Sequence, residues 1–158
     1  MIPASKKDGL ELIAVALGAE ATEDGKSGRY MDSINMFEYG FSNYKIQKIS
    51  SANTTVKEIS IENATKDTKN LPVLLKDDII ALTPNSIDLN NLNYNVSLNE
   101  NIVAPIQEGE LLGKITYNID GITYSSDLIA GHSVEKFNLN LIIAQIIFAI
   151  IVLFILIK

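Results

Sequence analysis

The run of seventeen residues before the C-terminal lysine constrains this chain most strongly. From Leu141 to Ile157 every residue is Ile, Leu, Val, Phe or Ala, except Gln145. As a helix the run would rise about 25 Å, close to the roughly 30 Å of hydrocarbon in a bilayer. The rest of the chain is too small to cover a helix that is apolar on every side. We therefore predict one transmembrane helix, with residues 139–158 in contact with the lipid bilayer.

The charge that follows this run indicates an orientation. Lys158 is the one charged residue beyond it, and the positive-inside rule places such a residue in the cytoplasm. The expected location is therefore a cell membrane, crossed once, with the body of the protein on the extracytoplasmic face. The abundance of Asn, Ile and Lys suggests an AT-rich coding sequence, which indicates a bacterial cell membrane. The residues before Leu10 contain no apolar export signal. A tail-anchored protein with a cytosolic body is thus an open alternative.

Composition excludes several classes of function. The net charge is −6, and no run of Lys and Arg is present, so we expect no nucleic-acid partner. The chain contains no Cys. This excludes a disulfide scaffold, a thiolate metal site and a cysteine nucleophile.

The N-terminal region predicts a strand and a helix. Asp8-Gly9 is a hairpin-turn dipeptide, and the nearly apolar Leu10–Leu17 that follows predicts a strand buried on both faces. A helix is expected over Ser27–Tyr39, with Ser27 as its N-cap and Gly40 as the glycine after its end. Its apolar stripe would consist of Tyr30, Ile34, Phe37 and Phe41.

Beyond residue 45 the pattern becomes short and alternating, as in antiparallel strands. Leu92–Leu98 alternates strictly between apolar residues and Asn or Ser, and Asp120-Gly121 joins two further segments as a two-residue hairpin. The other expected strands are Val56–Ile61, Ile79–Leu82 and Ile115–Ile119. This spacing predicts a small β sandwich over residues 45–135.

No group of residues indicates catalysis. His132 is the one histidine, and with no Cys or suitably spaced acid it is interpreted as a loop residue. Asp77-Asp78 and Glu108-x-Glu110 are interpreted as solvated turn residues, and Ser125-Ser126 lacks a neighbouring base. Lys114 enters a strand, which argues against a lipoyl or biotinyl carrier domain.

Three motifs in order resemble one family. SKKDGLELIAVALGA and the helix ending in YGFSNY resemble the end of the transpeptidase-like domain of penicillin-binding D-alanyl-D-alanine carboxypeptidases. IVAPIQEGELLGKITYNIDG, followed by DLIAGHSVEK, resembles their β-rich C-terminal domain. A C-terminal membrane anchor completes the order.

The resemblance implies an exported serine enzyme that removes the terminal D-Ala from peptidoglycan stem peptides. Such enzymes use an S-x-x-K nucleophile, an S-x-N element and a K-T-G strand, which lie upstream of the segment matching Leu10–Leu17. We predict that none of the three lies in this chain, since Ser5-Lys6-Lys7 and Ser27-Gly28-Arg29 do not fit. We therefore predict no catalytic, cofactor-binding or metal-binding residue, and expect the chain alone to be inactive.

The predicted architecture is mainly β and has three parts. Residues 1–44 would be the last strand and helix of a catalytic α/β domain, residues 45–135 an antiparallel sandwich-like domain, and residues 136–158 a linker and transmembrane anchor. The expected function is that of a C-terminal fragment, from a split or truncated gene, that serves as anchor and spacer for the parent enzyme. The alternative is a self-standing, non-enzymatic interaction module that binds other cell-envelope proteins.

Overall fold

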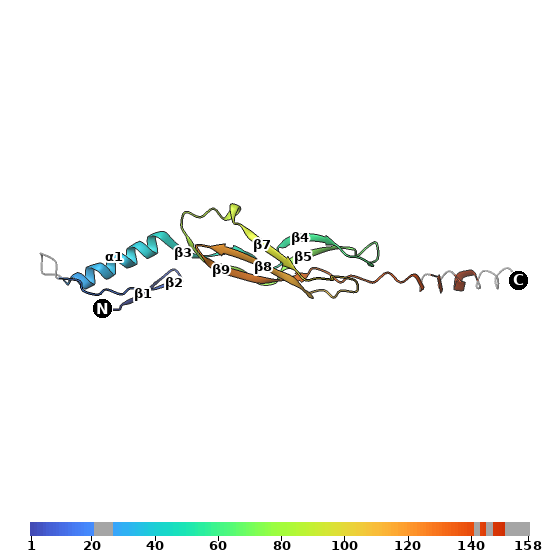
Figure 1. Cartoon of the computed structure of the whole chain (residues 1–158), viewed down its shortest axis with the longest axis horizontal. Coiled ribbons are helices and arrows are strands. Elements are labelled where there is room, and N and C mark those ends of the chain that lie inside the picture. Colours follow the sequence, from blue (N-terminus) through green and yellow to red (C-terminus); the bar gives the residue numbers. More distant parts are fainter. Residues whose placement is uncertain (21–26, 141–142, 145–146, 151–158) are drawn as a thin grey trace. The chain divides into compact units, whose positions relative to one another are not determined.

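The computed structural model describes residues 1–20, 27–140, 143–144 and 147–150 (Figure 1). These residues are mainly β, with antiparallel strands and few helices. In chain order the elements are β1 (Ala4–Lys7), β2 (Leu10–Ile13), α1 (Gly28–Asn43), β3 (Tyr44–Ser50), β4 (Thr55–Ser60), β5 (Asn70–Leu75), β6 (Ile79–Pro84), the 3-10 turn η1 (Leu89–Asn91), β7 (Tyr94–Leu98), β8 (Leu111–Ile119) and β9 (Ile122–Ala130).

The strands form three sheets. β1 pairs with β2, β3 pairs with β6, and a five-stranded sheet has the order β4-β5-β9-β8-β7. The chain divides into two compact units. The first unit consists of Met1–Ala52, Asp77–Val96 and Lys114–Ser126, and the second of Asn53–Lys76, Ser97–Gly113 and Asp127–Lys158. Strands β7, β8 and β9 contribute residues to both units.

The expected N-terminal hairpin is present in the first unit. Asp8 and Gly9 have φ angles of 49° and 83°, so both occupy the left-handed region that a two-residue hairpin turn requires. In the register of the hairpin, Ala4 lies opposite Ile13 and Lys7 opposite Leu10.

Helix α1 begins where the sequence predicts and ends one turn later. Ser27 is the N-cap residue, but its side chain accepts no capping hydrogen bond. Gly40 was expected after the helix, yet it lies inside it, which makes that prediction wrong. A Cβ at position 40 would collide with the side chain of Leu12, so the glycine permits close approach of the hairpin. Figure 1 shows the hairpin lying beside α1.

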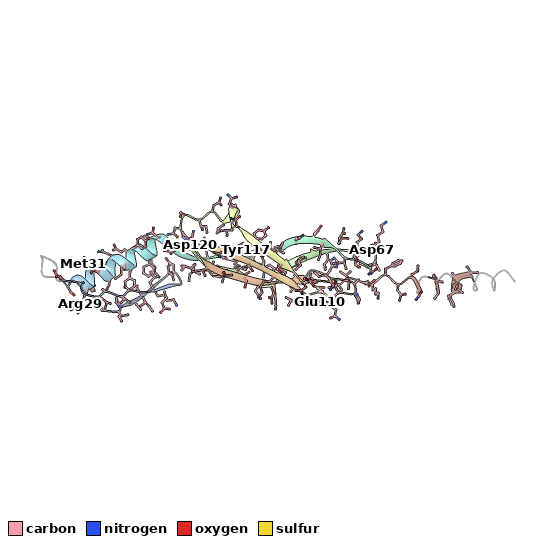
Figure 2. All side chains as sticks on the ribbon, in the orientation of Figure 1. Arg29, Met31, Asp67, Glu110, Tyr117 and Asp120 are labelled. Carbon is pink, nitrogen blue, oxygen red and sulfur yellow. The ribbon has the colours of Figure 1, made fainter. Side chains whose placement is uncertain are left out.

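In the remainder of the first unit, hydrogen bonds join strands of the β3–β6 sheet to strands of the five-stranded sheet, beside buried apolar residues such as Ile79 and Ile115. The Tyr124 hydroxyl on β9 accepts a hydrogen bond from the Leu82 N–H on β6 at 3.1 Å. Tyr117 on β8, which is 7% exposed, forms a hydrogen bond with Ser50 on β3. Figure 2 shows Tyr117 on this strand and Asp120 in the turn at its end. These contacts join two antiparallel sheets, while the predicted sandwich over residues 45–135 stays a prediction.

The second unit has its own apolar core. Alternate residues of β5 are completely buried, namely Leu71, Val73 and Leu75. They share this core with Leu112, Leu128, Ala130 and Val134. Gly113 on β8 is required where β7 passes, because a Cβ there would meet the backbone of Ser97 and Leu98. The Ala104–Pro105 peptide bond in the loop before β8 is cis.

Most of the predicted membrane span, Leu141–Ile157, lies outside the described residues. Residues 139–140, 143–144 and 147–150 have helical backbone. Across the part of the chain that the structure describes, no helix has the length and apolar character needed to cross a membrane.

Candidate functional site

The most unusual surface of the described chain is one face of the N-terminal hairpin. Backbone pairing continues beyond β1 and β2, because the Ala14 N–H donates to the Pro3 carbonyl at 3.0 Å and the Ala16 N–H to that of Met1 at 3.1 Å. Opposite residues in an antiparallel pair share a face, and successive residues along a strand point to opposite faces. One face therefore carries Ile2, Ile13, Val15 and Leu17, which we call the open face; these side chains are 70%, 70%, 53% and 83% exposed.

The other face of the hairpin packs against α1. Leu10, Ala14 and Ala16 are buried there, while Leu12 contacts Gly40. The prediction that Leu10–Leu17 is buried on both faces is therefore wrong for this chain. A two-stranded sheet with one covering helix has only one protected face, and the described residues place nothing on the other.

A recess lies between α1 and the residues that follow β2. It has a volume of about 380 Å³ and is lined by Val15, Ala16, Leu17, Asp32, Asn35 and Met36. Asp32 and Asn35 make the recess partly polar, whereas the open face beside it is an apolar surface that water contacts unfavourably. Such a surface favours burial against another polypeptide over chemistry on a small molecule.

The carboxylate pairs that stood out in the sequence have local structural roles. The Asp78 carboxylate accepts a hydrogen bond from the Ala52 N–H at 2.8 Å and forms an ion pair with Lys48 at 2.6 Å. Its pKa is lowered, first by the hydrogen bond from Lys48 and then by that from Ala52. Glu110 accepts a hydrogen bond from the Gln107 N–H at 2.9 Å, which closes a turn.

The other residues that the sequence singled out are dispersed. The Ser126 hydroxyl accepts a hydrogen bond from the Asp77 N–H at 3.2 Å in the first unit. His132 lies in the loop after β9, and both of its ring nitrogens contact backbone carbonyl oxygens. Among the described residues no three His, Cys, Asp or Glu side chains are grouped so that they could hold a metal ion.

The prediction that neither an S-x-x-K nor an S-x-N element lies in this chain is wrong when the spacing of the residues alone is counted. Ser42-Asn43-Tyr44-Lys45 and Ser133-Val134-Glu135-Lys136 both have the S-x-x-K spacing. Three tripeptides, Ser33-Ile34-Asn35, Ser51-Ala52-Asn53 and Ser97-Leu98-Asn99, have that of S-x-N, whereas K-T-G has no match.

Neither S-x-x-K match has the local geometry of a nucleophile beside its base. Serine and lysine three residues apart become neighbours when one turn of helix carries both. Ser42 belongs to α1, which ends at Asn43, and Lys45 belongs to strand β3. Val134 lies in an extended bridge to Ile106, and extended backbone directs residues 133 and 136 to opposite sides.

Comparison with known proteins identifies the family. Residues 44–136, more than half of the chain, match the family described as penicillin-binding protein 5, C-terminal domain. The chain belongs to this family. It is also similar to the D-alanyl-D-alanine carboxypeptidase DacF of Bacillus subtilis (strain 168), at 26% identity over 126 residues, which are 80% of this chain and 31% of the relative.

Solved structures agree with the assignment to the penicillin-binding protein 5 C-terminal domain family. The D-alanyl-D-alanine carboxypeptidase DacD from Francisella tularensis matches with a TM-score of 0.56 and 26% identity, over 86% of this chain and 33% of that one. Penicillin-binding protein 5 from Haemophilus influenzae has the same fold, with a TM-score of 0.56 and 20% identity, over 86% of this chain and 38% of that one.

The chain thus spans about a third of the length of these relatives. The resemblance to the C-terminal part of penicillin-binding D-alanyl-D-alanine carboxypeptidases is confirmed. The open face of the hairpin is a feature that sequence reasoning missed. Most of the residues that form it lie in the nearly apolar run Leu10–Leu17, which was interpreted as buried on both faces, and a run of this kind does not distinguish a covered face from an open one.

Proposed function

We propose that this chain serves as the C-terminal part of a serine-type D-alanyl-D-alanine carboxypeptidase and carries none of its catalytic groups. The family match over residues 44–136 is the observation that carries the proposal. In this role the β-rich residues 45–135 are a spacer. They hold the catalytic part at a set distance from the membrane, where it acts on peptides that end in D-alanyl-D-alanine.

The packing of the second unit supports the spacer role. In the described residues no buried side-chain nitrogen or oxygen lacks a hydrogen-bond partner. Leu71, Val73 and Leu75 are completely buried without any contribution from an enzyme domain. A rigid spacer needs this property, because a loosely packed one would not fix a distance.

The open face supports the assignment of residues 1–44 to a catalytic domain. Ile13 and Leu17 are large apolar side chains that face solvent in this chain. A further layer of the catalytic domain, packed on the open face, would remove them from water. The hairpin also has two unpaired edges within the described sheet β1–β2, which further strands could join.

The proposed anchor is the apolar run at residues 139–158. The side chains that are described there, among them Ile143, Ile147, Phe148 and Ile150, are exposed on the isolated chain. Lipid would cover them in a bilayer. We propose a single crossing of a bacterial cell membrane, with the two units on the extracytoplasmic face.

Covalent labelling tests the absence of catalytic groups. The purified full chain in detergent is incubated with a fluorescent penicillin, beside an active D-alanyl-D-alanine carboxypeptidase as a positive control. We expect no labelled band for the chain. A labelled band that disappears in the Ser42→Ala variant would overturn the proposal, and Ser133→Ala is the matched test of the second S-x-x-K match.

Extraction of membranes with alkaline carbonate tests the anchor separately. The full chain should remain in the membrane pellet, whereas a variant with both Ile147→Lys and Ile150→Lys should be released. Each Lys near the centre of a span costs about 2.5–3.5 kcal/mol of insertion free energy. A double variant that stays as tightly bound as the original chain would contradict a spanning anchor.

A further inference from the structure

His132, the single histidine of the chain, lies where the backbone pairing between β5 and β9 stops. The last bond of this pairing is donated by the Gly131 N–H to the Pro72 carbonyl at 2.9 Å. Proline has no N–H and cannot return a bond to β9. The carbonyl of Asn70, two residues earlier, lies on the same edge of β5 and has no backbone donor opposite it on β9.

The His132 side chain supplies the missing donor. Gly131 makes the approach possible, because a Cβ there would lie 2.8 Å from Pro72 Cγ. The Nε2 atom of His132 is then 2.9 Å from the Asn70 carbonyl oxygen. Its Nδ1 atom is 2.9 Å from the carbonyl oxygen of Ser133.

Both ring nitrogens therefore face oxygen acceptors. A neutral imidazole carries one N–H and one lone pair, so it can satisfy only one of these two contacts, whereas the imidazolium donates to both. Three groups act on the ring. Glu108, in the loop before β8, is the charged one. The other two are the carbonyl of Asn70 on β5 and the carbonyl of Ser133, the residue after His132. The Ser133 carbonyl, then that of Asn70, and to a lesser degree Glu108, raise the pKa of His132, while partial burial opposes them.

The same short segment is attached to the loop that contains Glu108. The Glu108 N–H donates to the Ser133 hydroxyl at 3.0 Å. Val134 and Ile106 exchange two backbone hydrogen bonds, at 2.8 and 3.0 Å. Residues 131–134 are thus fastened on one side to β5, by the Gly131 N–H and by His132, and on the other to the loop before β8.

We propose that His132 is a pH-sensitive clamp, which as an imidazolium donates to both carbonyl oxygens and fastens residues 131–134 to the start of β5, and which on deprotonation keeps only one of the two bonds and holds them more weakly. This device concerns the second unit alone and does not depend on the proposed function. Because the pKa is raised on folding, the added stability is fully present below the unfolded value of about 6.5 and is lost as the pH rises through the folded pKa. Weakening of the clamp affects residues 131–133 first, because Val134, Glu135 and Phe137 keep backbone hydrogen bonds of their own.

Titration of the full chain in detergent micelles tests this directly. With one histidine per chain, ¹⁵N- and ¹³C-labelled histidine gives a single set of ring signals in NMR. We expect a higher pKa in the folded chain than in the same chain unfolded in urea. A folded pKa equal to or below the unfolded one would overturn the proposal.

Hydrogen exchange measures how far residues 131–134 open when His132 loses its proton. The protection of the Gly131 N–H, corrected for the intrinsic pH dependence of exchange, should fall as the pH rises through the folded pKa of His132. The open population should grow by up to about tenfold for each unit between the folded and unfolded pKa values. In the His132→Gln variant, which keeps one neutral donor, the protection should not change over this pH range. A pH-dependent loss that persists in this variant would contradict the clamp, and if the variant does not fold, the titration of the original chain decides alone.

Discussion

At the scale of single residues, Asn and Asp account for every described non-glycine position with a left-handed backbone. These positions are Asp8, Asn53, Asn63, Asn101 and Asp120. Asn and Asp tolerate this conformation because their short polar side chains form local hydrogen bonds. Asn53 and Asn63 begin tripeptides that match the glycosylation pattern, and their place in left-handed turns gives a structural reason for an asparagine there.

A small residue is also required where two strands come close. In the Gly113→Ala variant the new methyl group would meet the backbone of Ser97 and Leu98 on β7. We expect the free energy of unfolding to fall by about 1–3 kcal/mol, the usual cost of overpacking. Urea denaturation measures it, with Lys114→Ala as the exposed neighbour that should change stability by less than about 0.5 kcal/mol. Equal effects of the two substitutions would contradict the close approach.

The ion pair of Asp78 predicts that the stability of the chain depends on pH in the acidic range. The pKa of Asp78 is lowered on folding, first by the hydrogen bond from Lys48. The contribution of Asp78 to stability is therefore present above the unfolded value of 3.8, and it is lost as the pH falls through the folded pKa. The Asp78→Asn variant should therefore be less stable than the original chain at pH 7. The difference in unfolding free energy between the two proteins, measured by urea denaturation, should disappear in strong acid. A difference that does not vary with pH would contradict an origin in the ionised Asp78 carboxylate.

At the scale of elements, turns were predictable and strand partners were not. The Asp8-Gly9 and Asp120-Gly121 hairpins form as the dipeptides indicate, because their preference is local. Strand β5 was not predicted, since Pro72 interrupts it and proline is rare inside sheets. It is tolerated because the backbone pairing of β5 with β9 ends at this residue.

The two faces of the N-terminal hairpin should respond differently to charge. Leu12→Lys places an ammonium group against Gly40 and α1, and we expect it to unfold the hairpin and helix. Ile13→Lys changes a side chain that is 70% exposed, so the stability should change by less than about 0.5 kcal/mol. Far-ultraviolet circular dichroism and urea denaturation compare the two variants. If Ile13→Lys were as destabilising as Leu12→Lys, this result would contradict the exposure of the Ile13 side chain on the open face.

At the scale of the whole molecule, the described chain contains the penicillin-binding protein 5 C-terminal domain together with a hairpin and a helix before it. The chain divides into two compact units, and both contain buried apolar residues. Strands β7, β8 and β9 run through both units, so no single cut in the sequence separates them. The expected boundaries after residues 44 and 135 stay predictions.

The core of the second unit should depend on its buried leucines. Leu71 is completely buried on β5, and Leu71→Ala should lower the free energy of unfolding by about 2–5 kcal/mol. Leu89→Ala, on the 39% exposed side chain of η1, is the matched control and should have a much smaller effect. Thermal and urea unfolding of the two variants make the comparison. Similar losses would show that β5 does not form the core described here.

The sequence by itself determined the family, the antiparallel β character and the hairpin turns, because these depend on residue order and on local backbone preference. Only the tertiary structure decided what each apolar residue contacts. A nearly apolar run such as Leu10–Leu17 does not show how many of its faces are covered. In the sequence Gly40 has the position of a helix-ending glycine, whereas in the fold it lies inside the helix against Leu12. Nor could spacing reveal that His132, interpreted as an ordinary loop residue, lies between two carbonyl oxygens. Such contacts join residues far apart in the chain, and they exist only once the strands have paired.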